Sequence, residues 1–451
     1  MKAGHSFPFT AFVDQELFKL ALILNAINPK IGGLLVRGEK GAGKSVLVRA
    51  LADLLPEIAV VKGCPFNCSP NDSTNMCDPC RSRFESGENL EVERKKMRVI
   101  TLPIGATEDR VVGTLDLEKV LREGVRALQP GILAEVNQSI LYVDEINLLP
   151  DHIVDSILDA AAMGWNIVER EAISVSHPSR FLLVGTMNPE EGDLRPQLLD
   201  RLPMSVTIKG VADEAQRMEI VKRNLEFERD PSAFADKYEN DQKQLMDRIV
   251  KARGLLPNVT VPELFLSGVA KMAISLQVDG HRPDIVITKA AMAIAAFEGR
   301  TSVETYDMQR AAILALGHRT RRGGFEEPAS PQDVAASYDK ALEEAKREEE
   351  MRTQQGRRES QKHNRAARGS KSTSDSSSSG TTKATQASGP PKASSRLDQV
   401  ARSVKESAKR IISSMSRKPS DISRREGKRR GEGSQQGMDQ GQVRYGSPQR
   451  A

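Results

Sequence analysis

The sequence of 451 residues has few aromatic residues, few cysteines and no long apolar run. Phe, Trp and Tyr make up only 4% of it, and they form no aromatic and basic platform of the kind on which single-stranded nucleic acids stack. No stretch approaches the roughly 18 uninterrupted apolar residues of a membrane span. The N-terminal residues lack a charged segment followed by an apolar core, which argues against a secretion signal. We therefore expect a cytoplasmic protein.

The apolar residues that do occur are unevenly distributed. Residues 1–325 alternate short apolar strands with amphipathic helices, which indicates an α/β protein, whereas the remainder is rich in Ser, Arg, Lys, Gln and Gly. The net charge of +5 therefore combines a mildly acidic globular part with a basic tail. We expect a charged helical linker over 326–351 and a disordered, serine-rich tail over 352–451, because almost no bulky apolar side chain is present there.

One segment reads as a complete phosphate-binding loop, composed of Gly38, Glu39, Lys40, Gly41, Ala42, Gly43, Lys44 and Ser45. Apolar residues predict a strand leading into it, and the apolar spacing beyond it predicts a helix leading out. The backbone N–H groups of such a loop surround phosphate oxygens, while Lys44 would reach the β- and γ-phosphates and Ser45 would contact Mg²⁺. The loop therefore predicts binding of ATP with Mg²⁺.

Two further apolar strands end in polar residues suited to hydrolysis. The strand over 139–143 is followed by Asp144, which would hold the Mg²⁺ shell, and by Glu145, which would orient or deprotonate the attacking water. The alternative is that both carboxylates cap the next helix. The strand over 181–186 leads to Asn188, whose amide could hold that water in line, although Asn-Pro is also a common turn signal.

Three arginines are candidates for contact with the nucleotide. Arg201 ends a short helix and would act as an arginine finger on a neighbouring subunit, unless it simply pairs with Asp200 or another surface acid. Arg195 is the second candidate for that role. The pattern becomes entirely helical from about residue 214, and Arg282 begins one of these helices, where it could fold over the bound nucleotide or remain solvated.

All four cysteines lie close together, at Cys64, Cys68, Cys77 and Cys80. Their spacing, with prolines at the intervening turns, is compatible with a small tetrahedral site, and we expect a structural Zn²⁺ there. An iron–sulfur cluster, a redox-regulated dithiol and unliganded core cysteines remain alternatives.

Taken together, the motifs resemble an AAA+ ATPase, and longer strings resemble the ATPase (I) subunit of magnesium chelatase. These strings are residues 102–116, 141–149, 164–171 and 188–201, and the resemblance covers about residues 6–325. It implies an AAA+ α/β nucleotide-binding domain with a parallel sheet over 1–213, into which the cysteine segment 64–80 is inserted. An all-α lid domain would follow over 214–325.

The resemblance also implies a function and partners. ATP hydrolysis by a homo-oligomeric ring, which we expect to be a hexamer, would drive insertion of Mg²⁺ into protoporphyrin IX by a separate large porphyrin-binding subunit. A second AAA+ subunit with an integrin-like domain would bridge the two. Within this sequence, the resemblance assigns the first nucleotide motif to 38–45, the second to Asp144 and Glu145, the sensor to Asn188, the finger to Arg201 and the second sensor to Arg282.

Some features depart from that family or leave alternatives open. Ala42-Gly43 stands where the family often has Thr-Ala, Leu202 replaces the usual Phe, and the chain continues far beyond His318. The cobaltochelatase ATPase shares the same motor, so the chelated metal stays open, and a MoxR-like remodelling ATPase is a further alternative. The basic tail could bind an acidic partner, an anionic surface or nucleic acid.

Overall fold

The computed structural model describes residues 6–39, 41–115, 128–170, 173–192, 194–319 and 329–369. Lys40 of the phosphate loop, the end of the expected lid domain at 320–325 and the expected tail from residue 370 onward lie outside these residues. Residues up to Gly369 form one compact unit. No helix among the described residues combines the length and the hydropathy required to cross a bilayer.

A parallel sheet of five strands organises the first part of the chain, in the order β11-β1-β10-β7-β4. Its strands are β1 (Leu34–Gly38), β4 (Val99–Leu102), β7 (Ile140–Val143), β10 (Leu182–Met187) and β11 (Met204–Ile208). In register, Leu34 lies beside Val184 on one side and Met204 on the other. The apolar runs predicted as strands fit this arrangement, because a parallel sheet is covered on both faces.

Helices cover the two faces of the sheet and separate its side chains into two cores. Leu34 and Val36 belong to the core shared with α1 (Glu16–Ile27) and α2 (Lys44–Leu54), whereas Leu35 packs into the opposite core. That second core is completed by α4 (Glu108–Val112), α6 (Ile132–Glu135) and α7 (Asp151–Met163). Alternate residues of one strand thus anchor helices on opposite faces, which fixes the loops at both edges of the sheet.

Smaller elements extend from this framework. Antiparallel pairs are formed by β2 (Ile58–Val61) with β3 (Val92–Lys95), β5 (Gly113–Leu115) with β6 (Leu128–Pro130), and β8 (Trp165–Arg170) with β9 (Ile173–Pro178). Two short helices are α3 (Asp78–Glu85) and α8 (Pro196–Leu199). The 3₁₀ turns are η1 (Phe9–Ala11), η2 (Pro29–Ile31), η3 (Ser73–Asn75), η4 (Ile146–Leu148), η5 (Pro189–Glu191) and η6 (Leu256–Asn258).

The chain beyond β11 is helical, as expected. Its helices are α9 (Glu214–Arg229), α10 (Pro231–Leu255), α11 (Glu263–Ser275), α12 (Arg282–Phe297) and α13 (Thr305–Leu316). The fold class predicted from the sequence, an α/β AAA+ domain followed by a helical lid, is confirmed. At the end of α13, His318 is fully buried and donates from Nε2 to the Leu202 carbonyl at 2.8 Å. Burial lowers the pKa of His318 to about 3.

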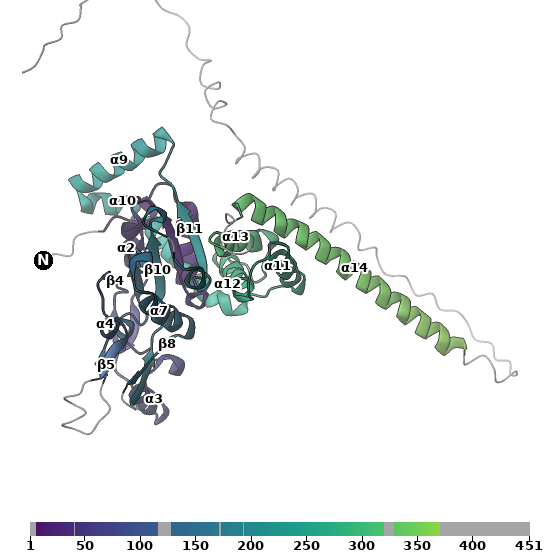
Figure 1. Ribbon diagram of the computed structural model, residues 1–451, viewed down its shortest axis with the longest axis horizontal. Coiled ribbons are helices and arrows are strands. Elements are labelled where there is room, and N and C mark those ends of the chain that lie inside the picture. The colour runs from purple at the N-terminus through teal and green to yellow at the C-terminus, as the bar shows by residue number, and fades with distance from the viewer. Residues whose placement is uncertain are drawn as a thin grey trace, which may run out of the picture. The chain divides into compact units, whose positions relative to one another are not determined.

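The last described helix differs from the expected linker. Helix α14 (Pro331–Gly369) continues past residue 352, where we placed the start of the disordered tail. It lies along α11 and α13 (Figure 1), and its Tyr338 and Leu342 side chains are buried in the same core as the lid helices. Gly268 of α11 faces this helix, and a Cβ there would lie 3.4 Å from the Tyr338 ring, at ordinary van der Waals distance. The first turns of α14 are therefore part of the lid.

Candidate nucleotide site and arginine-lined cavity

The phosphate loop lies at the carboxyl edge of the sheet, between the end of β1 and the start of α2. Gly43 is the N-cap of α2 with φ of 72°, a left-handed conformation that glycine adopts without a steric penalty. Gly38 lies against β11, where a Cβ would meet the Ile208 carbonyl oxygen at 2.4 Å. Lys44 donates from Nζ to the Gly38 carbonyl at 2.7 Å. The lysine and the N-terminal amides of α2 thus form an anion-binding end.

The acidic pair follows β7 on the same edge and is connected to β10 through one hydroxyl. Thr186 donates from Oγ1 to Asp144 Oδ1 at 2.6 Å, and Thr186 Oγ1 also accepts the Glu145 backbone N–H at 3.1 Å. Glu145 has φ of 54°, which is uncommon for a residue with a side chain and carries a cost of about 1 kcal/mol or more. Thr186 therefore fixes both the Asp144 carboxylate and the backbone turn of Glu145.

The hydroxyl of Tyr142 connects this acidic pair with the phosphate loop. It donates to Asp144 Oδ1 at 3.1 Å. Burial and, secondly, the Asp144 charge raise the pKa of Tyr142 to about 12, although hydrogen bonding with the Thr186 and Ser45 hydroxyls opposes the rise. Ser45 and Asp144 are thus neighbours of one phenol. A hydroxyl and a carboxylate placed together are the oxygen ligands that Mg²⁺ takes in phosphate-binding-loop ATPases, so the residues present fit the ion.

Asn188 is the third polar group at this edge. It follows β10 directly, is 6% exposed and accepts the Glu190 backbone N–H on Oδ1 at 3.3 Å. It therefore caps the turn η5, as an Asn-Pro sequence commonly does. Capping through Oδ1 leaves the amide Nδ2 on the other branch of the side chain, so this role and contact with a water are compatible.

Arg201 lies at the opposite edge, before β11, and is held within its own subunit. Its guanidinium pairs with Asp155 and Asp159 of α7, not with Asp200, which instead pairs with Arg319 at 2.7 Å. The other finger candidate, Arg195, forms an ion pair of 2.6 Å with Asp151 on the same helix. Since these acids are four residues apart, they share one face of α7.

A cavity of about 850 Å³ opens at this amino edge. Its lining includes residues that precede four strands of the sheet, namely Gly32, Met97, Ser139 and Pro203, together with Leu182 at the start of β10. Its cationic lining consists of Lys30, Arg180, Arg201, Arg253, Arg282 and Lys289. The cavity is therefore rich in positive charge.

The position of Arg282 bears on our expectation that it could fold over the bound nucleotide. Arg282 lines the amino-edge cavity together with Arg201, whereas the phosphate loop follows the carboxyl end of β1. That strand has five residues, and at about 3.3 Å per residue the two edges are roughly 16 Å apart. Helix α12 packs against α10, α13 and α1, and this packing places its first turn at the amino edge.

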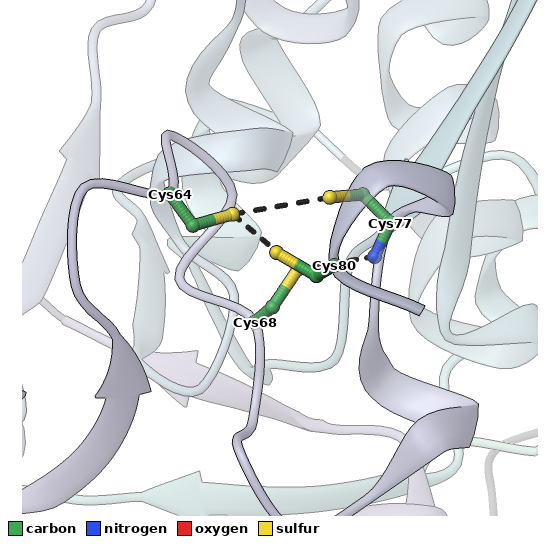
Figure 2. Close-up of side chains that lie close together, drawn as sticks. All are labelled: Cys64, Cys68, Cys77 and Cys80. Carbon is green, nitrogen blue, oxygen red and sulfur yellow. Dashed lines mark hydrogen bonds between the residues drawn. The ribbon is translucent and has the colours of Figure 1, made fainter. Parts of the chain in front are cut away.

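The four cysteines are brought together in a small core of their own (Figure 2). The Sγ atoms all lie within 4.8 Å of one another, with Cys64 at 3.5 Å from Cys68 and 3.9 Å from Cys77. All four are free thiols. Burial raises the pKa of Cys80 to about 12, whereas hydrogen bonding with Cys68 and Cys77 lowers the pKa of Cys64.

Two sets of residues at these edges were not identified from the sequence. Thr186 is a hydroxyl residue in an otherwise apolar strand, two positions before Asn188, and that contrast was a readable signal. Asp151, Asp155 and Asp159 repeat every four residues in a helix whose other residues are mostly apolar, which predicts one acidic face. Their pairing with Arg201 and Arg195 depends on the fold and could not be read in advance.

Comparison with known proteins places this geometry in a family. A model described as magnesium chelatase, subunit ChlI, matches residues 118–198, and a model of the AAA lid domain matches 267–337. The ChlI homolog of Methanocaldococcus jannaschii is 58% identical over 71% of this chain and 87% of its own length. The magnesium-chelatase subunit ChlI of Synechocystis is 53% identical over 71% of this chain and 90% of its own length.

A solved structure is also similar in sequence. The complex between subunits BchI and BchD of magnesium chelatase contains a chain 42% identical to this one, covering 74% of this chain and 99% of that chain, with a TM-score of 0.43. The motifs, the parallel sheet with its helical lid, and the identity over most of the length of the relatives agree. This chain belongs to the ChlI family of magnesium-chelatase ATPase subunits, within the AAA+ class.

Proposed function

We propose that this chain is the ATP-hydrolysing motor subunit of a magnesium-chelatase complex. The ATP hydrolysis that it catalyses would drive insertion of Mg²⁺ into protoporphyrin IX by a large porphyrin-binding subunit. The observation that carries the proposal is the convergence of Lys44, Asp144, Glu145 and Asn188 at one sheet edge, in a chain of the ChlI family.

Each residue at the carboxyl edge has a separate part in hydrolysis. Lys44 and the amides of residues 38–45 would bind the phosphates, and Ser45 with Asp144 would hold a Mg²⁺ ion, which would neutralise phosphate charge. Glu145 orients or deprotonates the attacking water, and Asn188 keeps that water in line with the γ-phosphate.

Arg201 and Arg282 would act on the ATP of a neighbouring subunit. Both line the amino-edge cavity, roughly a strand length from their own phosphate loop, so neither reaches its own γ-phosphate in this conformation. A homo-oligomeric ring, proposed to be a hexamer, would present this edge to the next subunit's loop. Arg201 would then exchange Asp155 and Asp159 for phosphate oxygens, and guanidinium contact stabilises the charge that develops there.

The remaining finer predictions concern partners and a second metal. We propose assembly with a second AAA+ subunit carrying an integrin-like domain, and binding of an acidic partner or surface by the basic segment over 352–451. We also propose that Cys64, Cys68, Cys77 and Cys80 bind Zn²⁺, at a site separate from the nucleotide.

The test is reconstitution with the two partner subunits of a ChlI-family chelatase, ATP, Mg²⁺ and protoporphyrin IX, followed by porphyrin fluorescence. The intact chain should support metal insertion, and Glu145→Gln should bind ATP without supporting it. ATP hydrolysis without insertion of Mg²⁺ would refute the chelatase assignment while leaving the motor intact. Insertion of Co²⁺ into a tetrapyrrole in place of Mg²⁺ would assign the chain to the cobalt enzyme.

A further inference from the structure

The four cysteines come from two segments that meet at one point. Cys64 and Cys68 lie in the loop after β2, Cys77 is the N-cap of α3, and Cys80 lies in the first turn of that helix. Figure 2 shows their thiols turned toward one another. Cys68, Cys77 and Cys80 are each at most 5% exposed, so the sulfur cluster is enclosed by the loop.

The distances between the thiols match a single tetrahedral ion. A Zn–S bond of about 2.3 Å gives sulfur atoms about 3.8 Å apart in a regular tetrahedron, and the structure has separations of 3.5 and 3.9 Å with none above 4.8 Å. A cubane iron–sulfur cluster needs a wider arrangement, because each thiolate binds a different iron atom. Cys77 also donates its backbone N–H to Cys68 Sγ at 3.1 Å, a contact that supports a charged sulfur ligand.

The core around these thiols is too small to order the loop by apolar packing alone. Its buried members are Val61, Cys68, Met76, Cys77, Cys80 and Leu90. Segments with so few buried side chains generally require a metal or a disulfide, and here the thiols are unbonded. A structural ion contributes its binding free energy directly to the ordering of such a loop.

The loop is attached to the core of the protein at the amino edge of the sheet. Asn137, which precedes β7, donates to the carbonyl groups of Phe66 and Asn67 at 2.8 and 3.1 Å. The Phe66 ring stacks on the buried His177 ring, with centroids 4.9 Å apart. The cysteine loop therefore contacts β9 and the segment that leads into β7.

The same loop holds one arginine of the cavity. Arg180 donates to Asp72 Oδ2 and to the Thr74 carbonyl, each at 2.9 Å. Desolvation opposes ionisation of Asp72, but hydrogen bonds from Thr74 and the Arg180 charge lower its pKa overall. Arg180 lines the amino-edge cavity with Arg201 and Arg282. Asp72 and Thr74 lie between Cys68 and Cys77, so ordering of the thiols fixes the acceptors of Arg180.

We propose that a Zn²⁺ ion bound by Cys64, Cys68, Cys77 and Cys80 fixes the loop over residues 62–91 against the amino edge and thereby positions Arg180 in the arginine-lined cavity. The ion thus supports the edge that faces the next subunit, and it leaves the phosphate loop at the other edge untouched. The link to the next subunit rests on the proposed motor function, whereas the metal site and the position of Arg180 do not depend on that activity.

The first experiment measures metal content of the full chain, purified anaerobically, by elemental analysis. The intact protein should contain about one zinc per chain, and the double variant Cys77→Ser/Cys80→Ser should contain none. Ser82→Ala, on the exposed side of α3, is the matched control and should keep its zinc. Co²⁺ exchanged into the intact protein should give the visible absorption of a tetrahedral thiolate site, which tests the geometry without any variant. Iron in place of zinc, or no metal in the intact protein, would overturn the proposal.

The second experiment measures the consequence at each edge. In the cysteine variant, trypsin should cleave at Arg81 and Arg83 at least tenfold faster, while affinity for a fluorescent ATP analogue should stay within about twofold of the intact chain. Arg180→Gln should keep zinc and analogue binding but lower ATP turnover, as the zinc-free variant does. Zinc loss that leaves trypsin cleavage unchanged would refute the structural role. Zinc loss with the expected cleavage but unchanged ATP turnover would refute only the link to the next subunit.

Discussion

Thr186 offers a direct test of how the acidic pair is positioned. Its Oγ1 is 2.6 Å from Asp144 Oδ1 and 3.1 Å from the Glu145 nitrogen, and the residue is only 1% exposed. The Thr186→Val substitution keeps the shape of the side chain and removes both hydrogen bonds. Thr186→Ser keeps the hydroxyl and is the matched control.

The size of the effect follows from the two bonds. A hydrogen bond to a charged acceptor contributes about 1.5–3 kcal/mol, and the left-handed turn at Glu145 loses its acceptor at the same time. If this free energy is lost from the transition state, ATP turnover should fall roughly 10- to 100-fold. Thr186→Ser should retain turnover within about threefold, because it loses a methyl group worth roughly 0.8 kcal/mol of burial and no hydrogen bond.

The assay is steady-state ATP hydrolysis at saturating ATP and Mg²⁺, with affinity for a fluorescent ATP analogue measured separately. The Val variant should bind the analogue within about threefold of the intact chain, because Lys44 and the loop amides are unchanged. Turnover by Thr186→Val equal to that of the intact protein would refute the role of this hydroxyl. Equal losses in the Val and Ser variants would indicate a packing effect instead.

Three other predictions concern the phosphate loop, the ion pairs of Arg201 and the dependence of stability on pH. Lys44→Ala should lower ATP affinity at least 100-fold by titration, because the ammonium that contacts the β- and γ-phosphates is removed; binding within tenfold would contradict its assignment. Asp155→Asn/Asp159→Asn should increase ATP turnover at low subunit concentration, because Arg201 no longer has to leave the two carboxylates before it binds phosphate. Unchanged turnover would show that these acids do not compete with phosphate for Arg201. His318 has a pKa of about 3 in the folded protein, below the value of about 6.5 in the unfolded chain. Between these two values the unfolded chain therefore binds more protons than the folded protein. The free energy of unfolding falls as the pH drops from 6.5 toward 3, by up to about 1.4 kcal/mol per pH unit. In denaturant titrations, the free energy of unfolding should fall less between pH 6 and pH 4 in His318→Gln than in the intact protein. An equal fall in the two proteins would show that His318 is not the cause.

Much of the nucleotide site could be predicted because it depends on local sequence. Apolar runs that end in Asp144 or Asn188 predict strands whose carboxyl ends meet at one edge, and the phosphate loop carries its own backbone requirements. The helical pattern from about residue 214 predicted a second, all-α part, and the family resemblance identified it as a lid. Bringing these strand ends together required only the order of the strands in the sheet, and the rules for connecting parallel strands leave few possible orders.

The remaining features depend on contacts between distant segments. Arg282 begins a helix as expected, but the packing of that helix determines which edge it faces, and no local pattern encodes this. The N-terminus of α10 is fixed by Asp230, which accepts the Ser232 and Ala233 amides. The apolar spacing of Val334, Tyr338 and Leu342 marks a packed face on α14, and it was obscured by the many charges around it.

The central claim, that one subunit supplies the acids and the next supplies the arginine, is tested most directly by mixing two inactive variants. Arg201→Ala lacks the finger and Glu145→Gln lacks the acid, so each alone should hydrolyse little ATP. Mixed assemblies contain interfaces with an intact Glu145 on one side and an intact Arg201 on the other. ATP turnover should therefore recover, with a maximum near equal proportions. No recovery at any ratio, in assemblies shown to contain both variants, would contradict the account.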